Sequence, residues 1–462
     1  MATAIPTSAT TAPPRVGFNL PVGLLAYVSV LLLALAATAF AYQGHADFRM
    51  VAWRIALCSI SNVSCALLGC YLVLRRLSLL GDAISHAVLP GIVVAFLLSG
   101  QLGGIWILVG AVGTGLLTAV LTQALSASGQ VGEDSSMGIV YTGLFAVGVL
   151  LVNFFARQTH IDPDCVLYGM IDNATLVKEI PPGIYRLGAV LITTILALVI
   201  FWKELKLVAF DPALATAMGF RVSLVHYGLM ALVAVAAVAA FEVVGSILVV
   251  AMLIIPAATA ALLTDRLLTM VLWAAAIAAG CALLGDLSAA VVNTSIAGMM
   301  SVIAGLHLVA AIFLAPRTGL VSRWWRNLQL SLRIVREDIL ATLYRLEERA
   351  GTETTRPRLA TWLNPIARGQ LVRQGMLAQQ SGEWKLTSAG RESARSIVRA
   401  HRLWETYLQK HFDLPPDHLH EPAERMEHFL DEQLQAELLA ELANETHDPH
   451  GRAIPETKAE SR

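Results

Sequence analysis

An aspartate and a histidine with helical spacing stand within an apolar stretch of the chain. Asp82 and His86 are four positions apart, so on a helix a carboxylate oxygen and an imidazole nitrogen share a face and can bind one cation. Ser85 adds a hydroxyl, and Pro90 cannot donate the backbone hydrogen bond to the carbonyl of His86, which frees that oxygen to face a cavity. If the stretch crosses a membrane, the cost of burying an ionisable pair predicts a function. The alternative is structural, with Asp82 capping the helix and pairing with His86.

Metal-ligand residue types also gather near the C-terminus, where seven of the twelve histidines lie between positions 401 and 450. Residues three or four apart share one face of a helix, so carboxylates and imidazoles with this spacing form compact ligand sets. Two such sets occur, one made of Glu424, Glu427 and His428, the other of His401 and Glu405, with His420 four positions before the first. A solvated acidic helix face is the alternative. Two sets in one short segment favour metal binding.

Polar groups elsewhere in the apolar part are isolated. His307 lies in the middle of an apolar run, where a lone histidine is more often a packing residue than a ligand; it is kept as a candidate for an ion path. Glu242 and Asp286 lie at the ends of apolar runs, where hydration at a membrane interface explains them.

The segment 211–220 has the signals of a short capped helix. Asp211 stands at the N-cap, Pro212 at the first helical position and Gly219 at the end, with Ala215 between them. Such a helix between two apolar runs could dock a cytoplasmic partner, or it could be a plain connector.

The elements that position these residues fall into two parts of different composition. Residues 1–316 carry 12 Lys and Arg and 13 Asp and Glu, whereas the shorter remainder carries 21 of each, which excludes a simple soluble enzyme. The first part contains ten apolar runs that approach or exceed the roughly 20 residues of a membrane-crossing helix. They are residues 22–42, 51–74, 84–98, 103–125, 136–156, 184–202, 222–240, 244–263, 267–284 and 295–314. Shorter runs could be re-entrant or broken, so we expect eight to ten transmembrane helices.

Lysine and arginine in the short loops indicate the orientation, because positively charged loops face the cytoplasm. If ten spans are counted, one side collects Arg75, Arg76, Lys203, Lys206, Arg221, Arg266, Arg317, Arg323 and Arg326. The other side holds Arg49, Arg54, Arg157 and Lys178. We therefore expect both termini in the cytoplasm.

Signals for several other chemistries are absent from the sequence. There is no GxxxxGK[ST] phosphate loop and no Gly-Lys dipeptide, so nucleotide must be handled by another chain. The five cysteines contain no CxxC pair and none lies in the charged part, which argues against a zinc ribbon, an iron–sulfur site and a disulfide framework.

Four motifs occur in order between residues 50 and 320. They are Gly81-Asp82-Ala83-Ile84-Ser85-His86 with Leu89-Pro90-Gly91, Phe210-Asp211-Pro212, Val244-Gly245 to Pro256-Ala257-Ala258, and Ala315-Pro316-Arg317. Together they resemble the permease subunits of bacterial ABC importers for manganese, zinc or iron. The resemblance implies that Asp82 and His86 line the ion path and that the segment 211–220 is the coupling helix on which an ATPase acts.

The same resemblance implies a location and partners. We expect a multi-pass protein of the bacterial inner membrane, in contact with lipid, that works with a cytoplasmic ATP-binding subunit, an extracytoplasmic metal-binding protein and a second permease subunit, identical or related. Ser85 and His307 are kept as further candidates for the path, and Ala215 and Gly219 as candidates for the ATPase contact.

The charged part has the pattern of a small soluble module. The spacing of apolar residues predicts helices over 328–349 and 394–407 and a hairpin over 379–387. Helices and a hairpin in this order indicate a winged-helix module.

Five motifs mark the segment 334–456. They are Glu337-Asp338 before Leu343-Tyr344-Arg345-Leu346-Glu347, Leu386-Thr387 with Gly390-Arg391, His401-Arg402-Leu403-Trp404-Glu405, His420-Glu421 through Glu427-His428, and Asp448-Pro449-His450-Gly451 with Ile454-Pro455. Together they resemble the metal-dependent repressors of the diphtheria toxin repressor family. The resemblance implies a primary metal site of Asp338, Glu424, Glu427 and His428 and a second site with His401, Glu405 and His420.

Particular positions refine this second resemblance. Iron-type members carry a cysteine where Glu424 stands, so the set resembles the manganese type, and we expect a divalent metal cofactor, manganese first, with iron or zinc as alternatives. Ala341 replaces a further acid of manganese-type members. The expected recognition helix, residues 364–374, is predicted to be interrupted by Pro365 and Gly369, so DNA is not expected as a partner.

We therefore expect an all-α polytopic membrane protein followed by a cytoplasmic winged-helix plus helical metal-binding and dimerisation domain. The expected parts are a flexible segment 1–19, a transmembrane permease domain 20–316, an amphipathic linker 317–333, a metalloregulator-like domain 334–456 and a tail 457–462. The expected function is that of a non-enzymatic permease subunit of an ATP-driven importer of divalent transition metal ions, with a metal-sensing domain. The alternatives are a membrane-tethered, metal-responsive transcription regulator and an ion-coupled secondary transporter.

Overall fold

The computed structural model describes residues 22–41, 48–77, 81, 83, 86–100, 105–129, 131–155, 171, 180–348, 364–380, 383–412, 415, 418–442 and 445–456. The expected terminal segments 1–19 and 457–462 lie outside these residues. The chain divides into two units, residues 1–322 and 323–462, and each is described by itself.

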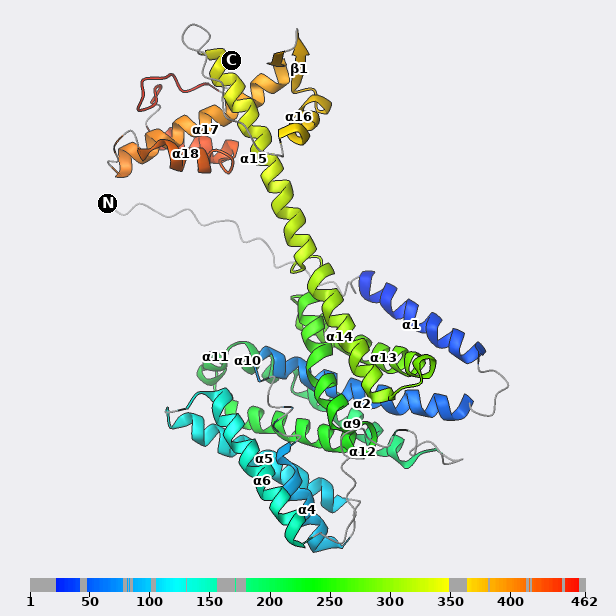
Figure 1. The fold of residues 1–462 in the computed structure, drawn as a ribbon. Helices are drawn as coiled ribbons and strands as arrows, with labels where there is room; N and C mark the ends of the chain where they lie inside the picture. The colour runs from blue at the N-terminus through cyan, green and yellow to red at the C-terminus, as the bar shows by residue number, and fades with distance from the viewer. Residues whose placement is uncertain are drawn as a thin grey trace. The chain divides into compact units, whose positions relative to one another are not determined.

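In its described part, the first unit consists of helices (Figure 1). They are α1 (Val22–Ala41), α2 (Phe48–Leu74), α4 (Leu89–Ser99), α5 (Ile105–Ala127), α6 (Glu133–Phe155), α9 (Pro182–Ile200), α10 (Trp202–Phe210), α11 (Pro212–Ala217), α12 (Val222–Leu263), α13 (Leu267–Val292) and α14 (Ile296–Leu314). Eight helices of the described residues are long and apolar enough to cross a membrane, with α12 counted as two, and shorter apolar helices lie in α1 and α4. The expected number of spans is therefore confirmed.

The long helix α12 contains a break near the start of the apolar run expected at 244–263. Gly245 has φ 79° and ψ 162°, far from helical values. Glycine adopts such angles at no steric cost because it has no Cβ. The helix therefore holds two spans, Val222–Phe241 and Val243–Leu263, with the break near the start of the second and Pro256 inside it.

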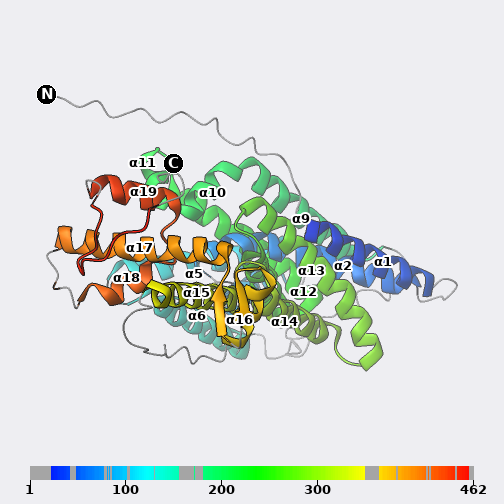
Figure 2. The same cartoon turned by 90° about the horizontal axis from the view of Figure 1, so that it is seen from above.

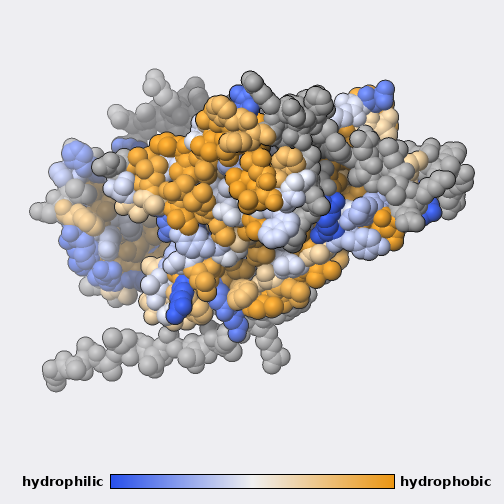
Figure 3. Space-filling model, turned by 90° about the horizontal axis from the view of Figure 1, so that it is seen from below, coloured by the Kyte–Doolittle hydropathy of each residue, from blue (hydrophilic) through white to orange (hydrophobic). Residues whose placement is uncertain are grey.

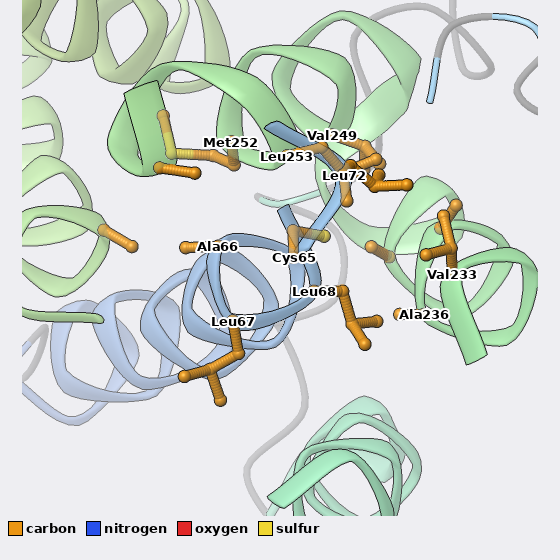
Figure 4. Packing of buried hydrophobic residues seen from close by; sticks show 14 of the residues in the cluster. Cys65, Ala66, Leu67, Leu68, Leu72, Val233, Ala236, Val249, Met252 and Leu253 are labelled. Carbon is orange, nitrogen blue, oxygen red and sulfur yellow. The ribbon is translucent and has the colours of Figure 1, made fainter. Parts of the chain in front are cut away.

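The core of the first unit lies where α2 packs against α12. Figure 4 shows buried side chains from both helices in contact, among them Cys65, Leu68, Leu72, Val249, Met252 and Leu253. Gly69 allows this approach, because a Cβ at that position would lie 1.7 Å from the carbonyl oxygen of Leu253. In an apolar bilayer, close backbone approach of this kind holds helices together where hydrophobic burial cannot.

Other helices of the first unit have apolar outer faces. Leu98 of α4, Trp106 of α5, Phe154 of α6 and Ile200 of α9 are all exposed. Figure 3 shows hydrophobic side chains spread over the face seen from below. Soluble proteins rarely expose contiguous apolar patches beyond a few hundred Å², so these faces fit contact with lipid.

The second unit combines helices with one hairpin. Its elements are α15 (Leu320–Glu348), which begins just before the unit, α16 (Asn364–Arg373), β1 (Leu377–Gln380), β2 (Glu383–Leu386), α17 (Ser388–Phe412), α18 (His420–Met426) and α19 (Glu432–Glu441). The strands are antiparallel with Leu377 opposite Leu386, and both leucines are buried with Leu371 of α16 and Val398 of α17. Figure 2 shows α17 beside α18 and α19. The order of helices and hairpin agrees with the expected winged-helix module.

The helix α16 corrects one expectation. The predicted interruption by Pro365 and Gly369 is wrong, because α16 runs unbroken from Asn364 to Arg373. Pro365 lies in the first turn, where its missing N–H has no intrahelical partner to lose, and a glycine inside a helix costs only about 1 kcal/mol. The exposed residues of α16 include the apolar Ile366 and Val372, and its basic residues are Arg368 and Arg373. The expectation that DNA is not a partner stays a prediction.

Candidate metal-binding sites

The carboxylate cluster, as we name Asp338, Glu427 and His428, joins α15 to the end of α18. His428 Nε2 lies 3.2 Å from Asp338 Oδ1, and His428 Nδ1 lies 2.8 Å from Glu337 Oε2. Glu427 is the C-cap of α18, and one ligand atom from each of the three residues lies within 4.8 Å of the others. Two carboxylates and one imidazole are donors that suit manganese, provided that the side chains draw closer around the ion.

The histidine cluster, as we name His401, Glu405 and His420, joins α17 to the start of α18. Glu405 Oε1 lies 3.0 Å from His401 Nε2 and 3.1 Å from His420 Nδ1, and these two nitrogens are 3.1 Å apart. Atoms bound to one ion at about 2.0–2.2 Å are separated by about 2.8–3.1 Å in an octahedral shell and by about 3.3–3.6 Å in a tetrahedral one. The three atoms therefore already have the spacing of one face of a coordination shell, and the donor set fits a divalent transition metal.

The two clusters meet at Glu427. Its Oε2 lies 2.6 Å from His401 Nδ1 and accepts a hydrogen bond from Arg345 Nη2 at 3.0 Å. His401 thus directs one ring nitrogen toward each cluster. Arg345 supplies the positive charge that a carboxylate as buried as Glu427 needs.

The electrostatics of both clusters favour charged side chains in the absence of metal. Burial alone would lower the pKa of His428, but hydrogen bonds to Asp338 and Glu337 outweigh it and raise the pKa to about 9. Burial alone would raise the pKa of Glu405, but contacts with His401 and His420 lower it to about 2. Burial of His401 is likewise outweighed by Glu405 and Glu427, so its pKa is raised.

The expected primary site is only partly brought together. Glu424 is exposed on α18 and belongs to neither cluster in the described residues. Ala341, at the position of the missing acid, is buried in the apolar core of the unit. Glu337, which sequence reasoning did not assign as a ligand, contacts His428 instead. The only sequence signal for it was its place beside Asp338.

The expected ion path is partly outside the described residues. Asp82 and Ser85 fall there, so their assignment stays a prediction. The His86 ring is half-buried, with its centroid 5.6 Å from that of Phe145 and 6.1 Å from that of Tyr141, both on α6. Pro90 is in the first turn of α4, and Val88, which precedes that helix, also has helical backbone angles (φ −70°, ψ −23°). The predicted opening of the backbone at His86 stays a prediction.

His307 lies against α1. Its Nε2 is 2.9 Å from the hydroxyl of Tyr27, and its Nδ1 is 2.8 Å from the carbonyl oxygen of Ile303. Both ring nitrogens thus have protein partners in this conformation. The place of His307 in the ion path stays a prediction.

The segment 211–220 folds as its capping signals predict. Asp211 is the N-cap of α11, where its carboxylate accepts a hydrogen bond from Leu214 N at 2.9 Å, and Pro212 follows in the first turn. Ala215 is buried, and Gly219 has φ 86° after the helix end. The role of these residues in contact with an ATPase stays a prediction.

A buried ion pair was missed by sequence reasoning. Arg54 of α2 donates to both carboxylate oxygens of Asp286 of α13, from Nε at 2.5 Å and from Nη2 at 3.1 Å. Asp286 is 1% exposed, which corrects the expectation that interface hydration explains it. No local pattern could reveal a pair 232 positions apart.

Comparison with known proteins identifies the first unit. Residues 47–315, more than half of the chain, match the ABC 3 transport family. The chain belongs to this family. This ABC 3 transport protein also matches, over residues 387–456, the iron dependent repressor, metal binding and dimerisation domain. The second match contains the whole histidine cluster together with Glu427 and His428.

Relatives of this ABC 3 transport protein include named metal transport proteins. The manganese transport system membrane protein MntD of Bacillus subtilis is 41% identical over 286 residues, which cover 60% of this chain and 97% of that protein. The zinc transport system membrane protein TroD of Treponema pallidum is 35% identical over 345 residues, 72% of this chain and 94% of that protein. The solved structure of PsaBC from Streptococcus pneumoniae in complex with a Fab is 30% identical, covers 62% of this chain and 97% of that chain, and has a TM-score of 0.53.

Proposed function

We propose that this protein is the permease subunit of an ATP-driven importer of divalent transition metal ions, with manganese as the favoured substrate and zinc or iron as alternatives. The observation that carries the proposal is the 41% identity to the manganese transport protein MntD over almost all of that protein's length. The likeness to TroD keeps zinc open as a substrate.

The proposal assigns roles within the first unit. Asp82 and His86, with Ser85 and His307, would line the path, because a carboxylate and imidazoles suit a divalent transition ion. A cytoplasmic ATP-binding subunit would act on α11, and a separate extracytoplasmic metal-binding protein would deliver the ion. A second permease subunit would complete the path in the bacterial inner membrane, with both termini of this chain in the cytoplasm.

The proposal also makes the second unit a sensor of cytosolic metal. The carboxylate and histidine clusters would hold metal, which supplies positive charge to buried carboxylates. Their residues come from α15, α17 and α18, so bound metal would tie these three helices together. We infer that metal binding in this unit reduces uptake when the cytosol is replete.

Metal content of whole cells tests the transport proposal. A strain without manganese, zinc and iron importers would express this chain with its ATPase and binding protein, and elemental mass spectrometry would measure all three metals. We expect the content of one metal to rise with the wild type and not with Asp82→Ala. Asp265→Ala is the matched control, because Asp265 is an exposed carboxylate paired with Arg317.

The same strain separates the alternatives. Glu427→Gln combined with His428→Gln should keep uptake high at raised cytosolic metal; normal regulation in this variant would contradict the sensor role. If expression of the wild type raises the content of none of the three metals, a membrane-tethered regulator becomes the favoured function. That function predicts that the protein binds DNA and that the binding weakens as the salt concentration rises. Uptake without any ATPase partner would indicate an ion-coupled transporter.

A further inference from the structure

A third imidazole lies beside the two imidazoles of the histidine cluster. His450, in the loop after α19, has its Nε2 3.8 Å from Glu405 Oε1, the oxygen that contacts His401 and His420. The His450 side chain is 36% exposed, so its ring has room to rotate, whereas the Glu405 side chain is 2% exposed. Sequence reasoning placed His450 in a motif but assigned it no ligand role.

The backbone that carries His450 is held in place. Asp448 Oδ1 accepts hydrogen bonds from the backbone N–H groups of His450 and Arg452, at 3.0 and 2.7 Å. Gly451, with φ 75°, closes the turn by donating to Asp448 O at 2.9 Å. Because these bonds fix the backbone, rotation of the His450 side chain is the movement that would bring its nitrogen to an ion held by the histidine cluster.

The loop is also fastened to the helix that carries the cluster. Arg402, the neighbour of His401 on α17, donates from Nη1 to the carbonyl oxygen of Ala453 at 2.6 Å. Its Nε lies 3.7 Å from Asp448 Oδ2, and both side chains are buried. The loop and the cluster are thus positioned by the same turn of α17.

We propose that His450 is the fourth ligand of the histidine cluster and that the completed site binds zinc in preference to manganese. This inference rests on the metal binding proposed for the second unit. Imidazole suits zinc, whereas carboxylate oxygen suits manganese, and four protein ligands complete a tetrahedral zinc site. His401, His420 and His450 supply three imidazoles against the one carboxylate of Glu405.

The two clusters then differ in the metal they select. The carboxylate cluster offers two carboxylates and one imidazole, the opposite balance of donors. Zinc binds a given site more tightly than manganese, so a carboxylate-rich site holds manganese through its ligand type, its geometry and the availability of the metal. Selective zinc binding by the second unit therefore depends on the imidazole-rich site being complete. His450 completes the histidine cluster. The second unit then senses two metals, zinc at the histidine cluster and manganese at the carboxylate cluster.

The test uses the purified full chain in detergent, with zinc and cobalt(II) as probes. Zinc affinity is measured against a competing chelator, and cobalt(II) reports four-coordinate sites by strong visible absorption. The variants are His450→Gln and, as matched control, His447→Gln, whose ring lies in the same loop but against Thr446 Oγ1. Glu405→Gln measures the metal bound elsewhere in the chain, including at the carboxylate cluster. Its zinc binding and cobalt absorption are subtracted from those of each other protein, which leaves the contribution of the histidine cluster.

We expect His450→Gln to weaken zinc binding at the cluster by about tenfold or more and to reduce the cobalt absorption, with His447→Gln equal to the wild type. Manganese bound at the carboxylate cluster should not change. Identical zinc affinity and cobalt absorption in His450→Gln and wild type would overturn the inference and leave the proposed function standing. Equal zinc binding by wild type and Glu405→Gln would overturn it as well. If the wild-type second unit also binds no manganese, the proposed sensor fails with it.

Discussion

At the scale of single residues, the ion pair of Arg54 and Asp286 joins α2 to α13 in an apolar part of the molecule. Asp286→Asn removes the charge that faces the partly exposed guanidinium of Arg54, which we expect to cost about 1–3 kcal/mol. The double variant Arg54→Met with Asp286→Leu should lose much less, because no charge is left behind. Thermal unfolding of the purified protein in detergent measures both, and equal losses would show that the pair contributes only packing.

The raised pKa of His428 predicts a pH dependence of the metal-free second unit. Because the folded pKa is about 9 and the ordinary value is 6.5, the stabilisation is complete below about 6.5 and is lost as the pH rises through 9. We expect a loss on the order of 1–3 kcal/mol. Hydrogen exchange of α18 peptides in chelated full-length protein, corrected for the intrinsic pH effect, measures it. His428→Gln should flatten the dependence; a rise in protection toward pH 9 would contradict the assignment.

Local sequence patterns predicted those residues whose partners are close in the chain. Asp211 caps α11 and Glu405 reaches His401 because both contacts span three or four positions. Tyr27 with His307 and Arg54 with Asp286 depend on which helices pack together, and neither pair could be inferred from spacing. The position of His450 could not be inferred from spacing either, because the loop after α19 brings it next to Glu405 of α17 only in the folded chain.

At the scale of elements, the contact of α2 with α12 depends on Gly69. Gly69→Ala would place a methyl group against the carbonyl of Leu253, so the helices must separate, at a cost of about 1–3 kcal/mol. Gly188→Ala on α9 is the matched control, since a Cβ there meets nothing within 4 Å and alanine favours helix. Unfolding temperatures in detergent compare the two. An unchanged value for Gly69→Ala would mean that the helices are not as close as described.

The positions of most elements followed from hydropathy, because apolar runs long enough to cross a membrane are hard to mistake. The boundaries were less predictable where backbone geometry decides. Only the angles of Gly245 show that α12 breaks there, and the first turn of α16 accommodates Pro365 at a position that was expected to interrupt the helix. The hairpin spans 377–386, so it begins two residues and ends one residue before the expected 379–387.

At the scale of the whole molecule, the orientation inferred from charged loops predicts cysteine labelling. Met218, after α11, is 62% exposed and Val291, at the end of α13, is 86% exposed. In a Cys165→Ser background, Met218→Cys should react with an impermeant maleimide only from the cytoplasmic side and Val291→Cys only from outside. The remaining cysteines, Cys58, Cys65, Cys70 and Cys281, are buried and should give little background. Labelling of both positions from one side would reverse the assignment.

His401 gives the second unit a property that neither cluster has alone. A neutral imidazole has one proton, so an ion held at Nε2 would leave that proton on Nδ1, which lies 2.6 Å from Glu427 Oε2. The metal-free unit already favours a proton on each nitrogen, because Glu405 and Glu427 raise the pKa of His401. An ion at Nε2 would therefore replace one proton and keep the other facing Glu427, so both sites act on the same ring. Occupancy of one site would then change the affinity of the other, and the unit would respond to two metals as a coupled pair.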